Sequence, residues 1–298
     1  MTLRIATRGS DLARWQAEHV GRLLAERAAT AHELVVVSTT GDLRRDVPIG
    51  ELSGTGIFVK EVQAAVLDGR ADLAVHSAKD LPSSFHAPGL SLASVPERGD
   101  PRDALVGSTL AALAEGATVA TGSARRRTQL AAARPDLRFV GLRGNLATRV
   151  DCVRQDGIDV VPVALVAMRR LGMAQHVAEV LDPEVCVPQV GQGALAVECR
   201  DDDPATIERL AAIEDPTARR LVDAERAFLA TLGGGCDLPV GAAASLGESG
   251  AVRVIGVLAA PDGSQVLRDE VVGDEPAIGA SLATQLLDGG GRELLGVR

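Results

Sequence analysis

The stretch Leu3-Arg4-Ile5-Ala6-Thr7-Arg8-Gly9-Ser10-Asp11-Leu12 decides the fold class of this 298-residue chain. Leu3–Thr7 has the residue pattern of a strand, and Ser10 stands where a hydroxyl side chain caps the first turn of a helix. We expect one face of that helix to carry Leu12, Trp15, His19, Leu23 and Leu24. A strand that runs directly into a helix opens a βαβ unit, so the sequence predicts an α/β protein.

The same rhythm continues through the first hundred residues. A β-branched run at Leu34–Ser38 indicates a second strand, followed by an expected helix at 57–67 and a third strand at Ala71–Ser77. This alternation predicts a mostly parallel sheet with helices on both faces. The pattern breaks into charge and proline near Pro96–Pro101, which we interpret as a first linker.

A second alternating block follows this linker. Its expected strands are Thr118–Thr121, Leu137–Leu142 and Asp159–Leu165, and its expected helices are Ala124–Ala133 and Leu146–Gln155. The block closes at a second linker, Val187–Gly193. Residues Ala194–Glu198 again show the alternating pattern of a strand and are expected to return to the first sheet. The chain would then cross between the two blocks twice, and the two linkers would form a hinge.

The character of the chain changes after Pro216. One expected helix, Thr217–Thr231, is followed by strand signals and a final helix, a pattern typical of an α+β domain with an antiparallel sheet. The strand signals are Val240–Leu246, Ala251–Leu258 and Gln265–Val272. We therefore predict domain 1 at 1–97 and 192–213, domain 2 at 98–191, and domain 3 at 214–298.

Composition excludes several classes of function. The chain is 46% hydrophobic and 24% charged, as in an ordinary globular protein, and its net charge of −9 disfavours general nucleic-acid binding. No apolar stretch resembles a signal peptide or a membrane span, so we expect a cytoplasmic protein without a membrane partner. The four cysteines are widely spaced with no Cys-x-x-Cys pair, so neither a metal site nor a disulfide framework is expected.

Arginines gather at two consecutive strand-to-helix junctions. The first junction reads Thr121-Gly122-Ser123-Ala124-Arg125-Arg126, and the second contains Arg143 and Arg149 around Gly144-Asn145. Cations at a helix N-terminus are unfavourable unless an anion offsets them, so the pattern indicates a bound carboxylate or phosphate. A solvated basic face is the alternative, but its repetition at two junctions favours an anion site.

The first block offers a matching set. Arg8 and Ser10 lie at one junction and Lys79 just past another strand, so all three are expected at the same edge of the sheet. Asp80 is an acid among these cations. It suits a simple ion pair or a cap before Pro82, yet a carboxylate in an anion site also suits acid–base or cation-stabilising chemistry.

Cys236 follows three glycines in Gly233-Gly234-Gly235-Cys236-Asp237 and has almost no apolar neighbours. On the residues alone, a functional thiol and an ordinary loop cysteine are both open. Other signals are weak: Gly191–Ala196 matches a dinucleotide pattern but precedes a strand rather than a helix. His19 and His76 suit packing or hydrogen bonding, Trp15 suits the core, and Phe58 suits either packing or an aromatic ligand.

Taken together, six segments in this order resemble the porphobilinogen deaminase family, over nearly the whole chain. They are Arg4–Ser10, Val75–Pro82, Gly122–Arg126, Leu142–Asn145, Val190–Ala194, and Gly234–Cys236 with Pro239 and Gly241. The resemblance implies a transferase that condenses four porphobilinogen molecules, with loss of ammonia, and hydrolyses the product to hydroxymethylbilane. It also implies three domains, the first two similar to the hinge-linked halves of periplasmic anion-binding proteins.

The resemblance assigns roles to residues of this chain. Cys236 would carry a dipyrromethane cofactor through a thioether, on a loop of domain 3, and Asp80 would be catalytic. The cofactor would be bound by Lys79, Thr121, Gly122, Ser123, Arg125 and Arg126. The substrate would be bound by Arg8, Ser10, Phe58, Arg143 and Arg149.

Two departures from the family pattern stand out. Ser53-Gly54-Thr55-Gly56 has Thr55 where a lysine is common, and Ala78 replaces a larger apolar residue. A cytosolic small-anion binding module with a two-domain hinge is the alternative function, but it leaves Asp80, Cys236 and domain 3 without roles. A ligand-sensing regulator is disfavoured by the acidic charge and the lack of a helix-turn-helix pattern. We expect a monomer whose partner is the small-molecule substrate.

Overall fold

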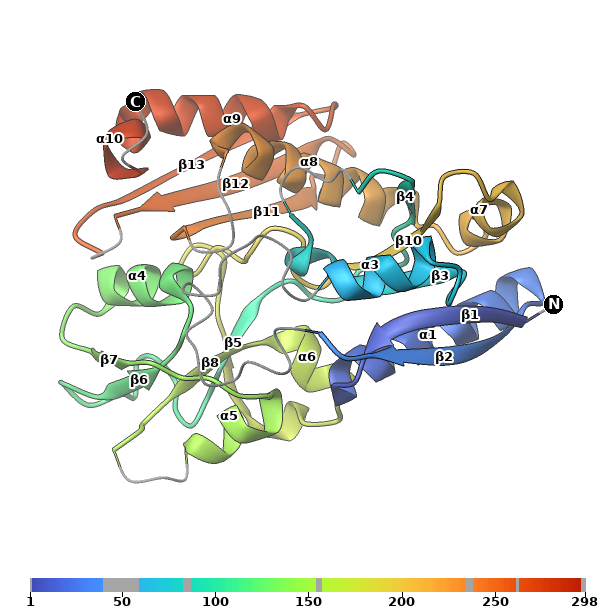
Figure 1. Ribbon diagram of the computed structural model, residues 1–298. Helices are drawn as coiled ribbons and strands as arrows, with labels where there is room; N and C mark the ends of the chain where they lie inside the picture. Colours follow the sequence, from blue (N-terminus) through green and yellow to red (C-terminus); the bar gives the residue numbers. More distant parts are fainter. Residues whose placement is uncertain are drawn as a thin grey trace. The chain divides into compact units, whose positions relative to one another are not determined.

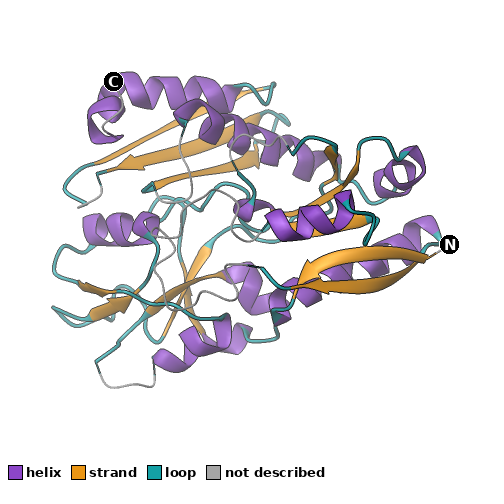
Figure 2. Ribbon diagram, in the orientation of Figure 1, coloured by secondary structure: helices purple, strands orange, loops and turns teal. Residues whose placement is uncertain are grey.

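The computed structural model describes residues 2–39, 59–82, 87–153, 157–233, 238–260 and 263–295, and its elements are drawn in Figures 1 and 2. It divides into two compact units. Unit 1 comprises Met1–Gly99 and Ala194–Arg220, and unit 2 comprises Asp100–Gly193 and Leu221–Arg298. The division into three domains stays a prediction.

Unit 1 is built on a five-stranded sheet in the order β2-β1-β3-β10-β4. The strands are β1 (Thr2–Arg8), β2 (Ala31–Val37), β3 (Leu73–Ser77), β4 (Leu90–Ser94) and β10 (Leu195–Arg200). β1 runs parallel to β2 and β3, whereas β10 runs antiparallel to β3 and β4. The expected return of the chain to the first sheet after the second linker is confirmed, and the sheet is mixed rather than mostly parallel.

Helices cover both faces of this sheet, as expected. Alternate residues of a strand point to opposite faces, so Ile5 packs with α1 (Asp11–Ala28) and α7 (Pro204–Ala211), while Ala6 packs with α3 (Lys60–Leu67). A short 3₁₀ turn, η2 (Ala78–Asp80), follows β3.

The face expected for α1 is correct only in part, because Leu24 is buried and Leu23 packs against the core, but Leu12, Trp15 and His19 are not buried. Its buried stripe contains Ala13, Ala17, Val20 and Leu24, together with Gln16 and Gly21. Small side chains let the helix approach the sheet closely. Trp15 and His19 stack on each other at a centroid distance of 5.0 Å and are only half-buried, so the tryptophan lies outside the buried core clusters of the described residues.

The first part of unit 2 contains a three-stranded antiparallel sheet, β8-β5-β9, and a parallel pair, β6-β7. The strands are β5 (Asp103–Val106), β6 (Thr118–Ala120), β7 (Arg138–Val140), β8 (Val161–Ala164) and β9 (Val177–Val180). Leu130 of α4 (Ala124–Ala133) packs on one side of β5, against Leu105. α5 (Leu146–Cys152) and α6 (Leu165–Arg170) pack on the other, and a 3₁₀ turn, η3 (Ala174–His176), precedes β9.

The second part of unit 2 is the expected antiparallel sheet, β11-β12-β13. Its strands are β11 (Val240–Leu246), β12 (Val252–Ala259) and β13 (Val266–Gly273). Phe228 of α8 (Pro216–Leu232) and Leu282 of α9 (Ile278–Leu286) bury one face, and Val187 packs on the other. The chain continues through η4 (Leu287–Gly291) into α10 (Arg292–Leu295).

Candidate functional site

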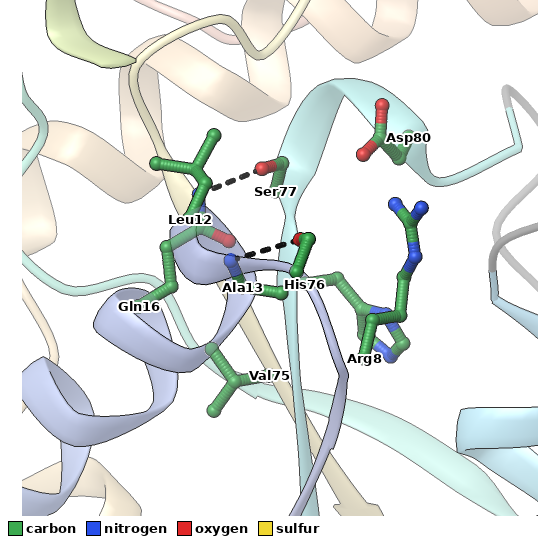
Figure 3. Close-up of a pocket in the computed structure, with 9 residues that line it drawn as sticks. Arg8, Leu12, Ala13, Gln16, Val75, His76, Ser77 and Asp80 are labelled. Atoms are coloured by element: carbon green, nitrogen blue, oxygen red, sulfur yellow. Dashed lines mark hydrogen bonds between the residues drawn. The ribbon is translucent and has the colours of Figure 1, made fainter. Parts of the chain in front are cut away.

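Unit 1 contains a pocket at the end of β3 where β1 leads into α1. Its polar lining comes from Arg8, Ser10, Gln16, His76, Ser77 and Asp80. Figure 3 shows the Arg8 side chain extending toward the carboxylate of Asp80. The structure therefore brings together Arg8, Ser10 and Asp80, as expected from the strand-end argument.

Ser10 caps α1, as predicted. Its Oγ accepts a hydrogen bond from the backbone N–H of Ala13 at 3.3 Å. Gln16, buried in the adjacent turn, donates through Nε2 to Ser77 Oγ at 2.8 Å, which ties α1 to the end of β3 (Figure 3). Lys79 lies on η2 beside Asp80 and is half-buried, but it is not among the lining residues.

His76 is buried and belongs to both the sheet and the pocket lining. Its Nε2 lies 2.8 Å from Oε2 of Glu198, a fully buried residue of β10. The expectation that His76 is a packed, partnered residue is confirmed. Glu198 gave no sequence signal, because a single acid in an apolar strand has no local pattern.

In unit 2 the first arginine junction lies at the start of α4. Ser123 caps the helix by accepting from the N–H of Arg126 at 3.4 Å, and its own N–H donates to Thr121 Oγ1 at 3.2 Å. A Cβ atom at Gly122 would lie 2.7 Å from the carbonyl oxygen of Leu142. Because Gly122 has no side chain, the first arginine junction can lie close to the second, which contains Leu142.

Arg125 and Arg126 are buried around a carboxylate that sequence analysis missed. Asp103, the first residue of β5, is 0% exposed, and its two oxygens lie 2.8 Å from Arg125 Nη2 and 2.7 Å from Arg126 Nη2. The expectation that these cations require a bound anion is thus corrected in part, because the chain itself supplies one carboxylate for two guanidinium groups. Asp103 opens the short apolar strand Asp-Ala-Leu-Val, and no periodic signal marks its role.

The second junction leaves its cations half-buried. Arg149 Nε donates to the carbonyl of Gly144 at 3.0 Å, and Asn145 caps α5. Burial, together with the charge of Arg126, lowers the pKa of Arg149 to about 10. Arg143 lies in the same junction. Arg170, which the sequence analysis did not single out, donates to Gly193 O at 2.8 Å, and burial lowers its pKa to about 10.

Three sequence predictions fall outside the described residues: Cys236, Phe58 and Thr55. The other three cysteines, Cys152, Cys186 and Cys199, are buried as free thiols. Burial raises the pKa of Cys186 to about 12 and that of Cys199 to about 11, so neither is a reactive thiolate near neutral pH.

The arginine cluster of unit 2 suits an anionic cofactor. Two guanidinium groups share one carboxylate, so the cluster keeps one net positive charge. The Nε atom of Arg125 is buried and has no hydrogen-bond partner among the described residues. Buried polar groups are nearly always paired, so this donor and the surplus charge fit a group that carries carboxylates.

Within the described ranges, no helix is long and apolar enough to cross a bilayer. The same residues contain no cluster of three or more His, Cys, Asp or Glu side chains that could hold a metal ion.

Known proteins place the chain in a family. Residues 3–208 match a sequence model described as "Porphobilinogen deaminase, dipyromethane cofactor binding domain", and residues 220–288 match "Porphobilinogen deaminase, C-terminal domain". A porphobilinogen deaminase from Pelobacter propionicus is 43% identical over 299 residues, which cover 98% of this chain and 96% of that protein.

Solved structures match more weakly. The methionine-binding protein MetQ is 13% identical, covers 73% of this chain and 92% of its own, and has a TM-score of 0.45. A periplasmic substrate-binding protein from Coxiella burnetii is 13% identical, with coverages of 73% and 94% and a TM-score of 0.44.

The sequence matches span both the cofactor-binding part and the C-terminal part, in the order in which the sequence motifs occur. The chain therefore belongs to the porphobilinogen deaminase family, whose transferases work with a dipyrromethane cofactor.

Proposed function

We propose that this chain joins four porphobilinogen molecules head to tail on a dipyrromethane held by Cys236, and then releases hydroxymethylbilane by hydrolysis. The observation that carries the proposal at residue level is the cluster in unit 2, where Arg125 and Arg126 share the single carboxylate of Asp103. Family membership supports the overall reaction.

The arginines bind the carboxylates of the pyrrole rings. Each porphobilinogen ring carries an acetate and a propionate, so negative charge accumulates as the chain of rings grows. Charge-assisted hydrogen bonds from guanidinium groups suit carboxylates in geometry and in charge. Arg125 and Arg126, with Thr121, Gly122 and Ser123 at the same junction and Lys79 of unit 1, serve the cofactor. Arg143 and Arg149 in unit 2, and Arg8 and Ser10 in unit 1, serve the incoming substrate, as does Phe58 outside the described residues.

Asp80 is the catalytic carboxylate. In each addition the carbon–nitrogen bond of the substrate aminomethyl group breaks and a carbon–carbon bond forms. The proton displaced from the accepting pyrrole carbon leaves with ammonia as ammonium. The cation that remains on the substrate when ammonia departs needs a nearby negative charge, and Asp80 supplies it in the pocket of unit 1. The same carboxylate can accept and return the displaced proton.

Cys236 is the anchor of the growing chain. The attached dipyrromethane supplies the free pyrrole carbon to which the first substrate ring is joined. A covalent anchor keeps each product of addition in place, so every later coupling is effectively intramolecular. Action as a monomer and a cytoplasmic location complete the proposal, and light scattering of the purified protein tests the former.

The experiment is the intact mass of the denatured wild-type protein before and after incubation with porphobilinogen, with peptide mapping around Cys236. Two linked pyrrole units on Cys236, and their absence from Cys236→Ser, are the expected result. If porphobilinogen is not consumed and Cys236 stays unmodified, the small-anion binding module replaces the proposal.

Asp80 has its own test with a matched control. Asp80→Ala should keep its thermal midpoint, but it should lose nearly all formation of hydroxymethylbilane. Asp68→Ala removes an acid from the exposed end of α3 in the same unit and should form product at the wild-type rate. Wild-type turnover by Asp80→Ala would remove Asp80 from the mechanism.

A further inference from the structure

Asp103 joins the arginine pair of unit 2 into one buried cluster. Its Oδ1 accepts from both Nε and Nη2 of Arg126, at 3.2 and 2.7 Å, and its Oδ2 lies 2.8 Å from Arg125 Nη2. The arginine side chains themselves are only 4% and 7% exposed. Their charges hold the pKa of Asp103 far below its ordinary value, despite the burial that opposes this shift.

The outer guanidinium nitrogens are fixed by backbone carbonyls. Arg125 Nη1 donates to Val187 O at 2.6 Å, and Arg126 Nη1 donates to Pro162 O at 3.0 Å. Each guanidinium group is thus held at one edge by Asp103 and at another by the main chain. Since a guanidinium group is planar, two such contacts define its orientation.

The same carboxylate holds the segment that contains the Gly-Gln-Gly motif. Gln192 is fully buried, and its Nε2 donates to Asp103 Oδ1 at 2.8 Å and to Pro101 O at 2.7 Å. The flanking Gly191 and Gly193 have φ values of +73° and +90°, a left-handed conformation that favours glycine. The motif therefore serves to turn Gln192 toward Asp103, rather than to bind a dinucleotide.

The charges in this cluster do not balance. Cys186 donates to Asp103 Oδ2 at 3.5 Å as a neutral thiol, because burial raises its pKa to about 12. Asp103 consequently offsets one of the two arginine charges and leaves one. Two buried guanidinium groups without any counter-ion would repel each other and would be expensive to desolvate. One carboxylate makes their burial possible and still leaves charge for an anionic ligand.

We propose that Asp103 is a positioning residue for cofactor loading. It orients Arg125 and Arg126 and offsets half of their charge before the dipyrromethane is attached, and Gln192 fixes Asp103 in this role. The inference rests on the proposed function, since it takes the two arginines as ligands of the cofactor. Asp103 itself acts only through the arginines.

The first test is Asp103→Asn, which preserves shape but removes the charge. Loading is measured as the fraction of chains that gain two linked pyrrole units with time in porphobilinogen, by intact mass. We expect loading to slow about tenfold, the factor that corresponds to 1.4 kcal/mol. A double-mutant cycle with Arg126→Gln tests this coupling: the double variant should slow loading by less than the product of the two single effects, since part of the effect of Asp103 passes through Arg126.

Two further variants keep the inference open to refutation. Gln192→Leu retains both ion pairs and should slow loading about threefold, a smaller effect because one hydrogen bond to Asp103 is lost. If Asp103→Asn does not fold, Gln192→Leu decides the question. Leu137→Ala, in the buried core of the same unit, lowers stability without removing a hydrogen bond or ion pair of Asp103 and should load at the wild-type rate. Equal slowing by Leu137→Ala at a matched thermal midpoint would reduce Asp103 to a structural role.

Inorganic sulfate provides a readout that does not depend on loading. Asp103→Asn leaves two uncompensated guanidinium charges, so sulfate should raise its thermal midpoint more than that of the wild type, at constant ionic strength. An equal shift in both proteins would overturn the charge argument. If the wild type itself never gains the two pyrrole units, the proposed function fails. If the wild type loads and Asp103→Asn loads equally fast, only this inference fails.

Discussion

Glu198 and His76 form a buried pair at the pocket of unit 1, with Oε2 and Nε2 2.8 Å apart and side-chain exposures of 0% and 3%. The contact has the distance of an ion pair but not the angles of a hydrogen bond. Gln63 of α3 donates to both carboxylate oxygens, at 2.9 and 3.1 Å. Because His76 also lines the pocket that contains Asp80, this pair fixes one wall of the proposed catalytic pocket.

The variant Glu198→Gln should destabilise unit 1. The substitution keeps the side-chain volume but sets an amide against the Gln63 amide and leaves His76 without its carboxylate. Breaking a buried pair by removing one partner costs about 3 kcal/mol. Urea unfolding followed by circular dichroism measures this loss. Glu208→Gln, on α7 of the same unit, is the control and should change the free energy of unfolding by less than about 0.5 kcal/mol. A similarly small effect for Glu198→Gln would show that the pair contributes nothing.

Asp103 should make the stability of unit 2 depend on pH in the acid range. The arginines lower its pKa in the folded state below the unfolded value of about 3.9, so the unfolded state binds the proton first. The stabilisation is therefore fully present above about pH 4 and is lost as the pH falls further. Between about pH 3.5 and 2.5 the free energy of unfolding should fall by roughly 1.4 kcal/mol per pH unit more steeply in the wild type than in Asp103→Asn. Urea titrations across this range test the difference, and parallel slopes would contradict the assignment.

The sequence predicted the local elements around these residues better than the contacts between them. The helix Ala124–Ala133 has the predicted bounds, because Ser123 provides a cap and the following residues favour a helix. Asp103 was not found, since its partners Arg125 and Arg126 lie more than twenty residues further along the chain. Strand β5, only four residues long, was missed for a related reason: such a run is too short to show a period.

The prediction of the buried face of α1 failed in part, and for a different reason. Large apolar residues were expected to mark its buried face, but Ala13 and Ala17 are buried and Trp15 is half-exposed. Apolar size does not determine which side meets the sheet when small residues allow closer packing. The arginine junctions and Asp80 were found because their placement follows from strand order, which the sequence pattern does reveal.

The Arg149 side chain should lower the stability of the folded protein. Burial and the charge of Arg126 disfavour its charged form, which lowers its pKa to about 10. Since a guanidinium group keeps its proton near neutral pH, the protein bears this cost as reduced stability. Arg149→Met should therefore raise the thermal midpoint by about 2–4 °C, for a gain of about 1 kcal/mol after solvent screening is allowed for. The KM for porphobilinogen should rise in the same variant.

The control for Arg149→Met is Arg127→Met, which removes an exposed arginine from α4. It should leave the thermal midpoint and the KM for porphobilinogen unchanged. Differential scanning calorimetry and steady-state kinetics give the two readouts. A lower thermal midpoint for Arg149→Met would show that Arg149 stabilises the fold through contacts that outweigh its unfavourable charge.

Gly241 of β11 should tolerate no side chain. A Cβ atom there would lie 2.6 Å from Pro188 O, 2.9 Å from Val187 O and 3.0 Å from Arg125 Cδ. Two of these atoms belong to the backbone and cannot turn away, so Gly241→Ala should cost about 2 kcal/mol of stability through overpacking. Arg125 would also be displaced from Asp103, so the gain of two pyrrole units should slow. Gly247→Ala is the matched control, because its Cβ atom would meet nothing closer than 3.6 Å. Wild-type unfolding and loading in Gly241→Ala would show that β11 can shift away from Arg125 without cost.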